Sequence, residues 1–150
     1  MAEFRLKPLL EYARDRSDSA ARELQRLRQQ WAQAEEKLQQ LQTYLADYQN
    51  RLNSNAAGGM TAAALRDFQR FIAKLELAIT AQQEDVVRCR QRWEAGQRVW
   101  MEREREVKAY DALRERHARE EVRKENKQDQ RIQDEFAQNQ RHRRDKEDPS

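Results

Sequence analysis

The sequence predicts an all-α protein: a long antiparallel two-helix coiled coil, or α-hairpin, whose second helix overhangs the first at its C-terminal end. Three observations predict it. Apolar or small residues recur at alternating steps of three and four through the first third of the chain. Charged residues make up 38% of the composition, which is typical of coiled coils when it accompanies such a repeat. Only three glycines and two prolines occur, so little of the chain can form loops.

The first helix is predicted at about residues 8–52. Pro8 suits its first turn, where the missing N–H is no loss. The repeat puts one line of side chains, the seam, on a single face of the helix. The seam positions are Leu10, Ala13, Ser17, Ala20, Leu24, Leu27, Trp31, Ala34, Leu38, Leu41, Leu45, Tyr48 and Leu52.

A turn is predicted at residues 53–61, because this stretch holds Gly58 and Gly59 and ends at Thr61, a suitable N-cap. The second helix is predicted at about residues 62–138 and carries its own seam. Its positions are Leu65, Phe68, Ile72, Leu75, Ile79, Gln82, Val86, Cys89, Trp93, Gly96, Trp100, Arg103, Val107 and Tyr110.

A short connection favours an antiparallel pair in which the two seams face each other. Counting outward from Ala57 pairs Ala20 with Trp93 and Ser17 with Gly96, so that bulky side chains meet small ones. The first helix then runs out near Arg103, and the charged helix beyond it is expected to overhang. Residues 139–150 are expected to be a disordered tail, and the whole chain is expected to form one hairpin domain that is monomeric when alone.

The composition also excludes several classes of function. A two-helix seam has no deep interior for a sheltered catalytic pocket, so we expect no enzyme and no cofactor. His117 and Glu121 stand four residues apart on a helix, a spacing too common by chance to indicate a metal site. The formal net charge is only +3, and charges of both signs alternate, which disfavours nucleic acid as the partner despite a pI of about 9.2.

Several features favour a cytoplasmic protein. Cys89 is the single cysteine and cannot form an internal disulfide, which indicates a reducing compartment. The N-terminus carries charges where a signal peptide needs an apolar core. No apolar run approaches the length of a membrane span.

Two aromatic residues near the turn are not required by the seam. Tyr44 and Phe71 fall at heptad position g, as does Ala78, which places an aromatic surface beside the seam at the tip of the hairpin. Exposed aromatic clusters often mark interaction sites. The alternative is that these side chains only cover a narrow core.

Four segments of the sequence resemble the FliJ family of flagellar export proteins. They are residues 33–38 (QAEEKL), 48–53 (YQNRLN), 67–76 (DFQRFIAKLE) and 127–137 (KQDQRIQDEFA). The resemblance implies an antiparallel coiled coil that serves as a soluble component of the flagellar type III export apparatus. It also implies binding to the hexameric export ATPase, to the cytoplasmic linker of the membrane export-gate protein and to export chaperones. Such a protein would lie in the cytoplasm, peripherally at the inner membrane below the flagellum.

The resemblance also implies which residues of this chain contact the export gate. The implied gate contacts are Leu41, Tyr44, Tyr48, Phe71, Leu75 and Ala78. Two positions depart from the family pattern, since Lys37 stands where a Gln is familiar and Gln82 where a His is.

The ATPase is expected to contact the free helix ends. The basic candidates there are Arg114, Arg116, Arg119, Arg123 and Lys124. Two other functions stay open from the sequence: the equivalent stalk of a virulence type III secretion system, and a purely structural coiled-coil spacer.

Overall fold

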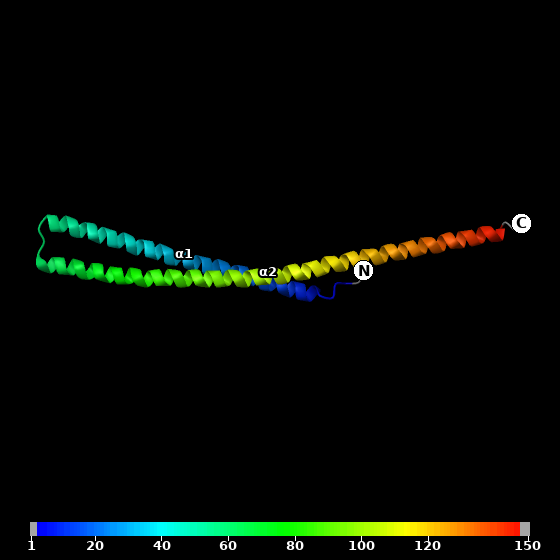
Figure 1. The fold of residues 1–150 in the computed structure, drawn as a ribbon, viewed down its shortest axis with the longest axis horizontal. Helices are drawn as coiled ribbons and strands as arrows, with labels where there is room; N and C mark the ends of the chain where they lie inside the picture. Colours follow the sequence, from blue (N-terminus) through cyan, green and yellow to red (C-terminus); the bar gives the residue numbers. More distant parts are fainter. Residues whose placement is uncertain (1–2, 148–150) are drawn as a thin grey trace. The chain divides into compact units, whose positions relative to one another are not determined.

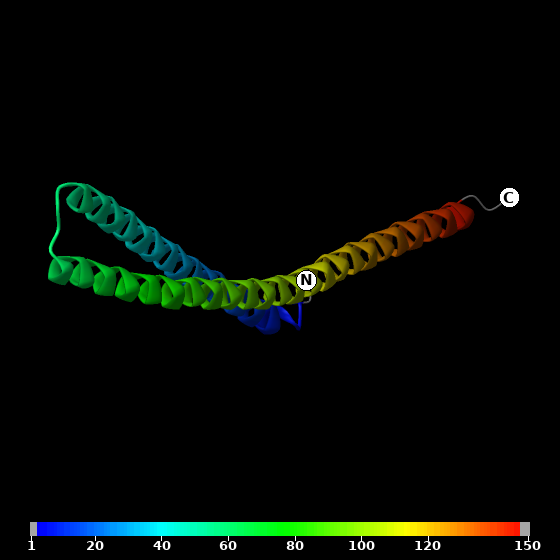
Figure 2. The same cartoon turned by 60° about the vertical axis from the view of Figure 1, so that its left-hand side comes forward.

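The computed structural model describes residues 3–147, which form two helices, α1 (Lys7–Ala57) and α2 (Ala62–Glu147), and contain no strand (Figures 1 and 2). The helices pack against each other in opposite directions, which confirms the predicted α-hairpin. The structure is described as two compact units. Unit 1 comprises Met1–Asp15 and Glu104–Ser150, and unit 2 comprises Arg16–Arg103. Within the described residues, neither helix has a stretch long and apolar enough to cross a membrane.

The first helix begins where the sequence predicts and ends later. The Lys7 N–H donates to the Phe4 carbonyl over 3.1 Å, and Pro8 lies in the first turn. At the other end α1 continues past the predicted residue 52 to Ala57, because no Gly or Pro interrupts it before Gly58. Gly59 then takes a φ of 89°, the left-handed conformation that glycine adopts without strain and that commonly ends helices.

The second helix also begins as predicted and extends further. The Thr61 hydroxyl accepts a hydrogen bond from the Ala64 N–H at 3.2 Å, which confirms Thr61 as the N-cap. At its C-terminal end α2 reaches Glu147, so residues 139–147 are helical where a disordered tail was predicted. The sequence contains no helix breaker after Gly96 until Pro149, and good helix formers dominate between them. Residues 148–150 of the predicted tail lie outside the described residues.

In unit 2 the two seams meet as predicted. The α1 seam residues from Ser17 to Leu52 are all buried or half-buried, and the α2 seam is buried at Leu75, Ile79, Gln82 and Cys89. Leu65, next to the turn, is the exception, with 37% of its surface exposed. The core of unit 2 is therefore a single line of interdigitating side chains between two helices.

The pairing of the seams differs from the predicted one. Trp93 packs on Trp31 with ring centroids 5.3 Å apart, and a Cβ on Gly96 would lie 2.7 Å from Leu27 Cδ1. The prediction placed Trp93 against Ala20 and Gly96 against Ser17. The cause is that α1 ends later than predicted, so the centre of the turn lies beyond Ala57. When the centre of the turn moves by one residue along the chain, the residue of α1 that faces a given residue of α2 changes by two.

In unit 1 the start of α1 packs against α2 beyond the predicted point. Arg14 forms an ion pair with Asp111 at 3.0 Å, and the Phe4 ring lies 5.7 Å from the His117 ring. The overhang therefore does not begin near Arg103, as the predicted pairing implied. The last partly buried residue of α2 is Glu121, and every residue from 122 to 147 is exposed.

Candidate interaction surface

Six residues near the turn, called here the tip surface, lie on successive turns of α1 and α2 in unit 2. Tyr48 and Phe71 make one rung between the helices, with ring centroids 4.3 Å apart. On α1, Tyr44 and Leu41 lie one and two helical turns from Tyr48. On α2, Leu75 and Ala78 lie one and two turns from Phe71, in the same direction away from the turn. The structure thus brings all six implied gate-contact residues to one region.

Exposure divides the tip surface into accessible and supporting residues. Tyr44 is 58% exposed, and Phe71 and Ala78 are exposed as well. Leu41 and Tyr48 are half-buried, and Leu75 is only 9% exposed. The accessible part therefore consists of Tyr44, Phe71 and Ala78, while Leu75 belongs to the core beneath them.

Aromatic contacts fix the orientation of Tyr48. Its ring meets Phe68 edge-on, with centroids 6.2 Å apart, in addition to its close contact with Phe71. The Arg51 guanidinium lies 5.4 Å from the centre of the same ring, within the range of a cation–π interaction. Three aromatic side chains and one cation therefore meet at this rung, and Phe71 packs on Tyr48 while it remains exposed to solvent.

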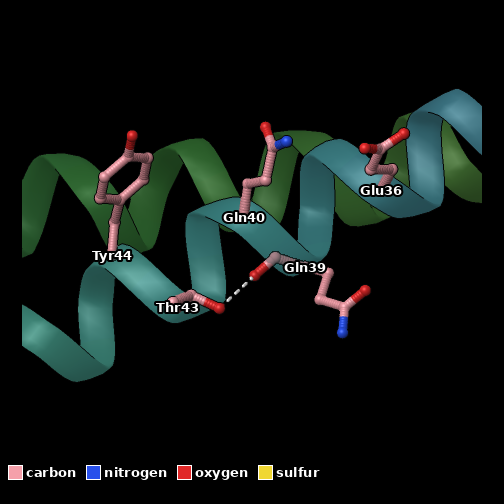
Figure 3. Close-up of a pocket in the computed structure, with 5 residues that line it drawn as sticks. All are labelled: Glu36, Gln39, Gln40, Thr43 and Tyr44. Carbon is pink, nitrogen blue, oxygen red and sulfur yellow. Dashed lines mark hydrogen bonds between the residues drawn. The ribbon is translucent and has the colours of Figure 1, made fainter.

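A shallow depression of about 540 Å³ adjoins Tyr44 on α1 (Figure 3). Glu36, Gln40 and Tyr44 lie four residues apart and point to the same side of the helix, whereas the Gln39 side chain points away. The depression offers a carboxylate, an amide and a phenol to a partner that contacts Tyr44. The sequence interpretation missed Glu36 and Gln40, although their helical spacing from Tyr44 could have revealed them.

The two positions that depart from the family pattern have different surroundings. Gln82 is 7% exposed and donates from Nε2 to the Ala34 carbonyl at 2.9 Å. It therefore joins the two helices and offers little surface to a partner. Lys37 is exposed on α1.

The basic candidates for ATPase binding lie on α2 in unit 1, and several have acidic neighbours. Arg114 lies 3.2 Å from Asp111, Arg119 lies 3.9 Å from Glu115 and Lys124 lies 3.8 Å from Glu121. Three of them line a shallow depression of about 510 Å³ together with apolar and acidic neighbours. Its residues are Ala109, Ala112, Leu113, Arg116, Arg119, Glu120 and Arg123.

The remaining chemistry of the described residues is sparse. No group of three or more His, Cys, Asp or Glu within residues 3–147 is placed to hold a metal ion. His117, considered above with Glu121, has its ring against Phe4. Cys89 is buried in the seam as a free thiol.

Comparison with known proteins agrees with this architecture. The profile of the family described as flagellar FliJ protein matches residues 1–146. The chain is 35% identical to the flagellar FliJ protein of Escherichia coli K12 over 133 residues, which cover 89% of this chain and 90% of that protein. It belongs to the FliJ family. The flagellar FliJ protein of Salmonella typhi, 32% identical over the same shares of both chains, is a further relative of this FliJ-family chain.

A solved structure shares the fold. A protein from Chlamydia trachomatis described as a YscO homologue superposes with a TM-score of 0.67, covering 99% of this chain and 100% of that one. Its sequence is 19% identical, so the likeness concerns the helical hairpin alone. The resemblance to FliJ predicted from four short segments is thus confirmed by matches along nearly the whole chain.

Proposed function

We propose that this FliJ-family chain is a non-enzymatic stalk and adaptor of the flagellar type III protein export apparatus. In this proposal it links the hexameric export ATPase to the membrane export gate and cooperates with export chaperones. It acts from the cytoplasm, at the inner face of the membrane below the flagellum. The observation that carries the proposal is the family match over residues 1–146, since membership places the chain among flagellar proteins.

The tip surface is the proposed contact with the cytoplasmic linker of the gate protein. Tyr44 and Phe71 expose large rings that the seam does not need, and Phe71 packs on the Tyr48 ring. Interfaces draw much of their affinity from a few such aromatic residues. Glu36 and Gln40 would supply polar contacts at the edge of the same surface.

The gate contact is tested by titrating the purified linker against the full-length protein in a calorimeter. Replacing Tyr44 or Phe71 with Ala is expected to weaken binding by about 1 kcal/mol or more each, the cost of removing a hot-spot side chain. Leu77→Ala is the matched control, because Leu77 is 72% exposed on α2 outside the tip surface. Equal affinities for Tyr44→Ala, Phe71→Ala and the native protein would contradict the proposed contact.

The basic residues of unit 1 are the proposed contact with the ATPase. Arg116, Arg119 and Arg123 share one depression on α2, so a partner with carboxylates could meet all three. Exposed charge pairs are screened over about 8 Å at physiological ionic strength, so this contact should weaken as salt rises.

Replacing Arg116, Arg119 and Arg123 together with Glu should abolish stimulation of the ATPase and leave gate binding unchanged. A triple change of Arg141, Arg143 and Arg144 to Glu alters the net charge equally at the exposed end of α2 and serves as the control. If both triple variants stimulate the ATPase as the native protein does, the assignment of the basic residues is wrong.

A further inference from the structure

The exposed part of α2 carries a second apolar line, called here the distal stripe: Ala118, Val122, Ile132 and Phe136. At 3.6 residues per turn, all four point within about 40° of one direction. Val122 is half exposed, and Ile132 and Phe136 are 64% and 63% exposed. Ala118 and every residue from 122 to 147 are exposed, so α1 leaves the stripe as an unpartnered helix face.

Charge divides this part of α2 into two opposite faces. Glu125 and Asp129 lie on the distal stripe, between its two apolar halves, and point within about 40° of the same direction. The opposite face is predominantly basic. Its charged residues are Arg116, Glu120, Arg123, Lys127, Arg131 and Asp134. A partner on the stripe would therefore meet apolar side chains at both ends and two carboxylates in the middle.

The position of the two carboxylates disfavours a second copy of this chain as the partner. An antiparallel copy aligned on the stripe would pair Val122 with the partner's Ile132 and Ala118 with the partner's Phe136. The same alignment would pair Glu125 with the partner's Asp129, so like charges would meet twice at the centre. A parallel copy would bring each carboxylate to its own equivalent. Like charges at facing seam positions oppose association, so self-pairing through the stripe is energetically disfavoured.

We propose that the distal stripe docks an amphipathic helix of another protein, whose apolar residues flank a central pair of Lys or Arg. Basic side chains there would satisfy Glu125 and Asp129 in the middle of the seam, while apolar side chains cover Val122, Ile132 and Phe136. This goes beyond the proposed contact with the ATPase, because Arg116 and Arg123 lie on the opposite face. The helix is already formed without a partner, so its backbone needs no ordering when the partner binds.

The test uses two fluorescent peptides that match the length of residues 118–136. Both have Leu at the positions facing the apolar stripe residues, and they differ only in the central pair, Lys-Lys or Glu-Glu. Fluorescence anisotropy with the full-length protein at low salt should give a dissociation constant at least roughly tenfold lower for the Lys peptide. Replacing Ile132 and Phe136 with Ala should weaken that binding by a similar factor.

Reversing the charge of the stripe carboxylates distinguishes binding on the stripe from general electrostatic attraction between the peptide and the protein. Replacing Glu125 and Asp129 with Lys should reverse the preference, so that the Glu peptide binds more tightly. The matched control replaces Glu120 and Asp134 with Lys, which changes the net charge equally on the opposite face and should keep the original preference. Circular dichroism should show the same helicity for both variants, since all four residues are exposed.

Several results would overturn the proposal. They are equal binding of the two peptides by the native protein, a preference that survives the Glu125 and Asp129 exchange, and a control variant that reverses the preference as strongly. Sedimentation showing a dimer of the native protein that Ile132→Ala and Phe136→Ala abolish would assign the stripe to a second copy instead. None of these results depends on gate or ATPase binding, so the proposed function is tested separately.

Discussion

Replacing Gln82 tests how one buried polar residue fixes the pairing of α1 and α2. Its side chain is 7% exposed and donates to the Ala34 carbonyl at 2.9 Å. Gln82→Ala loses this hydrogen bond, worth about 1 kcal/mol net, and a buried methylene worth about 0.8 kcal/mol. The free energy of unfolding should therefore fall by about 2 kcal/mol.

Gln82→Leu should behave differently. The Ala34 carbonyl lies within α1 and still accepts a hydrogen bond from the backbone N–H four residues further along the helix. No buried acceptor is therefore left unpaired when Gln82 is replaced. Leu buries more apolar surface than Gln, which offsets the lost hydrogen bond, so the stability should stay within about 1 kcal/mol of native. What Leu cannot supply is a directional bond across the seam, so alternative pairings of the helices should become populated.

Urea unfolding followed by tryptophan fluorescence measures the stability of unit 2, which contains Trp31, Trp93 and Trp100. Pairing is measured by disulfide formation after Cys89 is replaced by Ala. A protein with Leu27→Cys and Gly96→Cys forms a disulfide in the observed pairing. A protein with Ser17→Cys and Gly96→Cys forms one only if Gly96 of α2 faces a position of α1 nearer its N-terminus. With native Gln82 only the first should cross-link, and with Gln82→Leu both should.

Two results would refute the reasoning. If Gln82→Ala unfolds at the same urea concentration as native, the hydrogen bond contributes nothing to stability. If Gln82→Leu cross-links only through Leu27→Cys, apolar packing alone determines the pairing.

Four further substitutions, at three positions, probe other features of the hairpin. Gly96→Ala should change the free energy of unfolding by less than about 1 kcal/mol, because the gain in helix propensity is offset by the close approach of the new Cβ to Leu27 Cδ1 at 2.7 Å. Gly96→Leu adds a larger side chain at the same place and should lower the free energy of unfolding by about 1–3 kcal/mol. Both are measured by urea unfolding. Thr61→Ala removes the N-cap of α2 and should cost about 1 kcal/mol in the same measurement. Asp111→Asn removes the exposed ion pairs with Arg14 and Arg114 and should lower the thermal midpoint only slightly, with the difference vanishing in high salt. An undiminished loss in high salt would contradict the ionic origin.

The helices and their seams followed from the sequence because helical periodicity is a local property of the chain. The spacing of seven residues between Leu27 and Ala34 puts both on one face of the helix, and both are buried. The pairing did not follow, because it depends on where α1 stops. Residues 53–57 can form either helix or turn by composition, and only the cap at Gly59 settles the end of the helix.

The tip surface was also predictable in part. Tyr44 and Phe71 stood out because they are aromatic at positions the seam does not use, and the structure leaves both exposed. The burial of Leu75 could not be inferred from the resemblance alone, because the family pattern names positions without their accessibility. The distal stripe does not form a regular seam in the sequence, because two carboxylates interrupt its apolar residues.

The exposed end of α2 has a consequence for how this protein can change over generations. Helix formation in residues 122–147 rests on local propensity and on charge pairs along one helix, with no seam to preserve. A substitution there leaves the packing of unit 2 untouched, since distant and independent sites contribute separately to stability. Residues such as Ile132 can therefore vary to suit a new partner without risk to the hairpin, whereas a change of size at Ala34, which is buried in the seam, would disturb the packing of the two helices. The chain separates the part that must stay constant to fold from the part that is free to adapt.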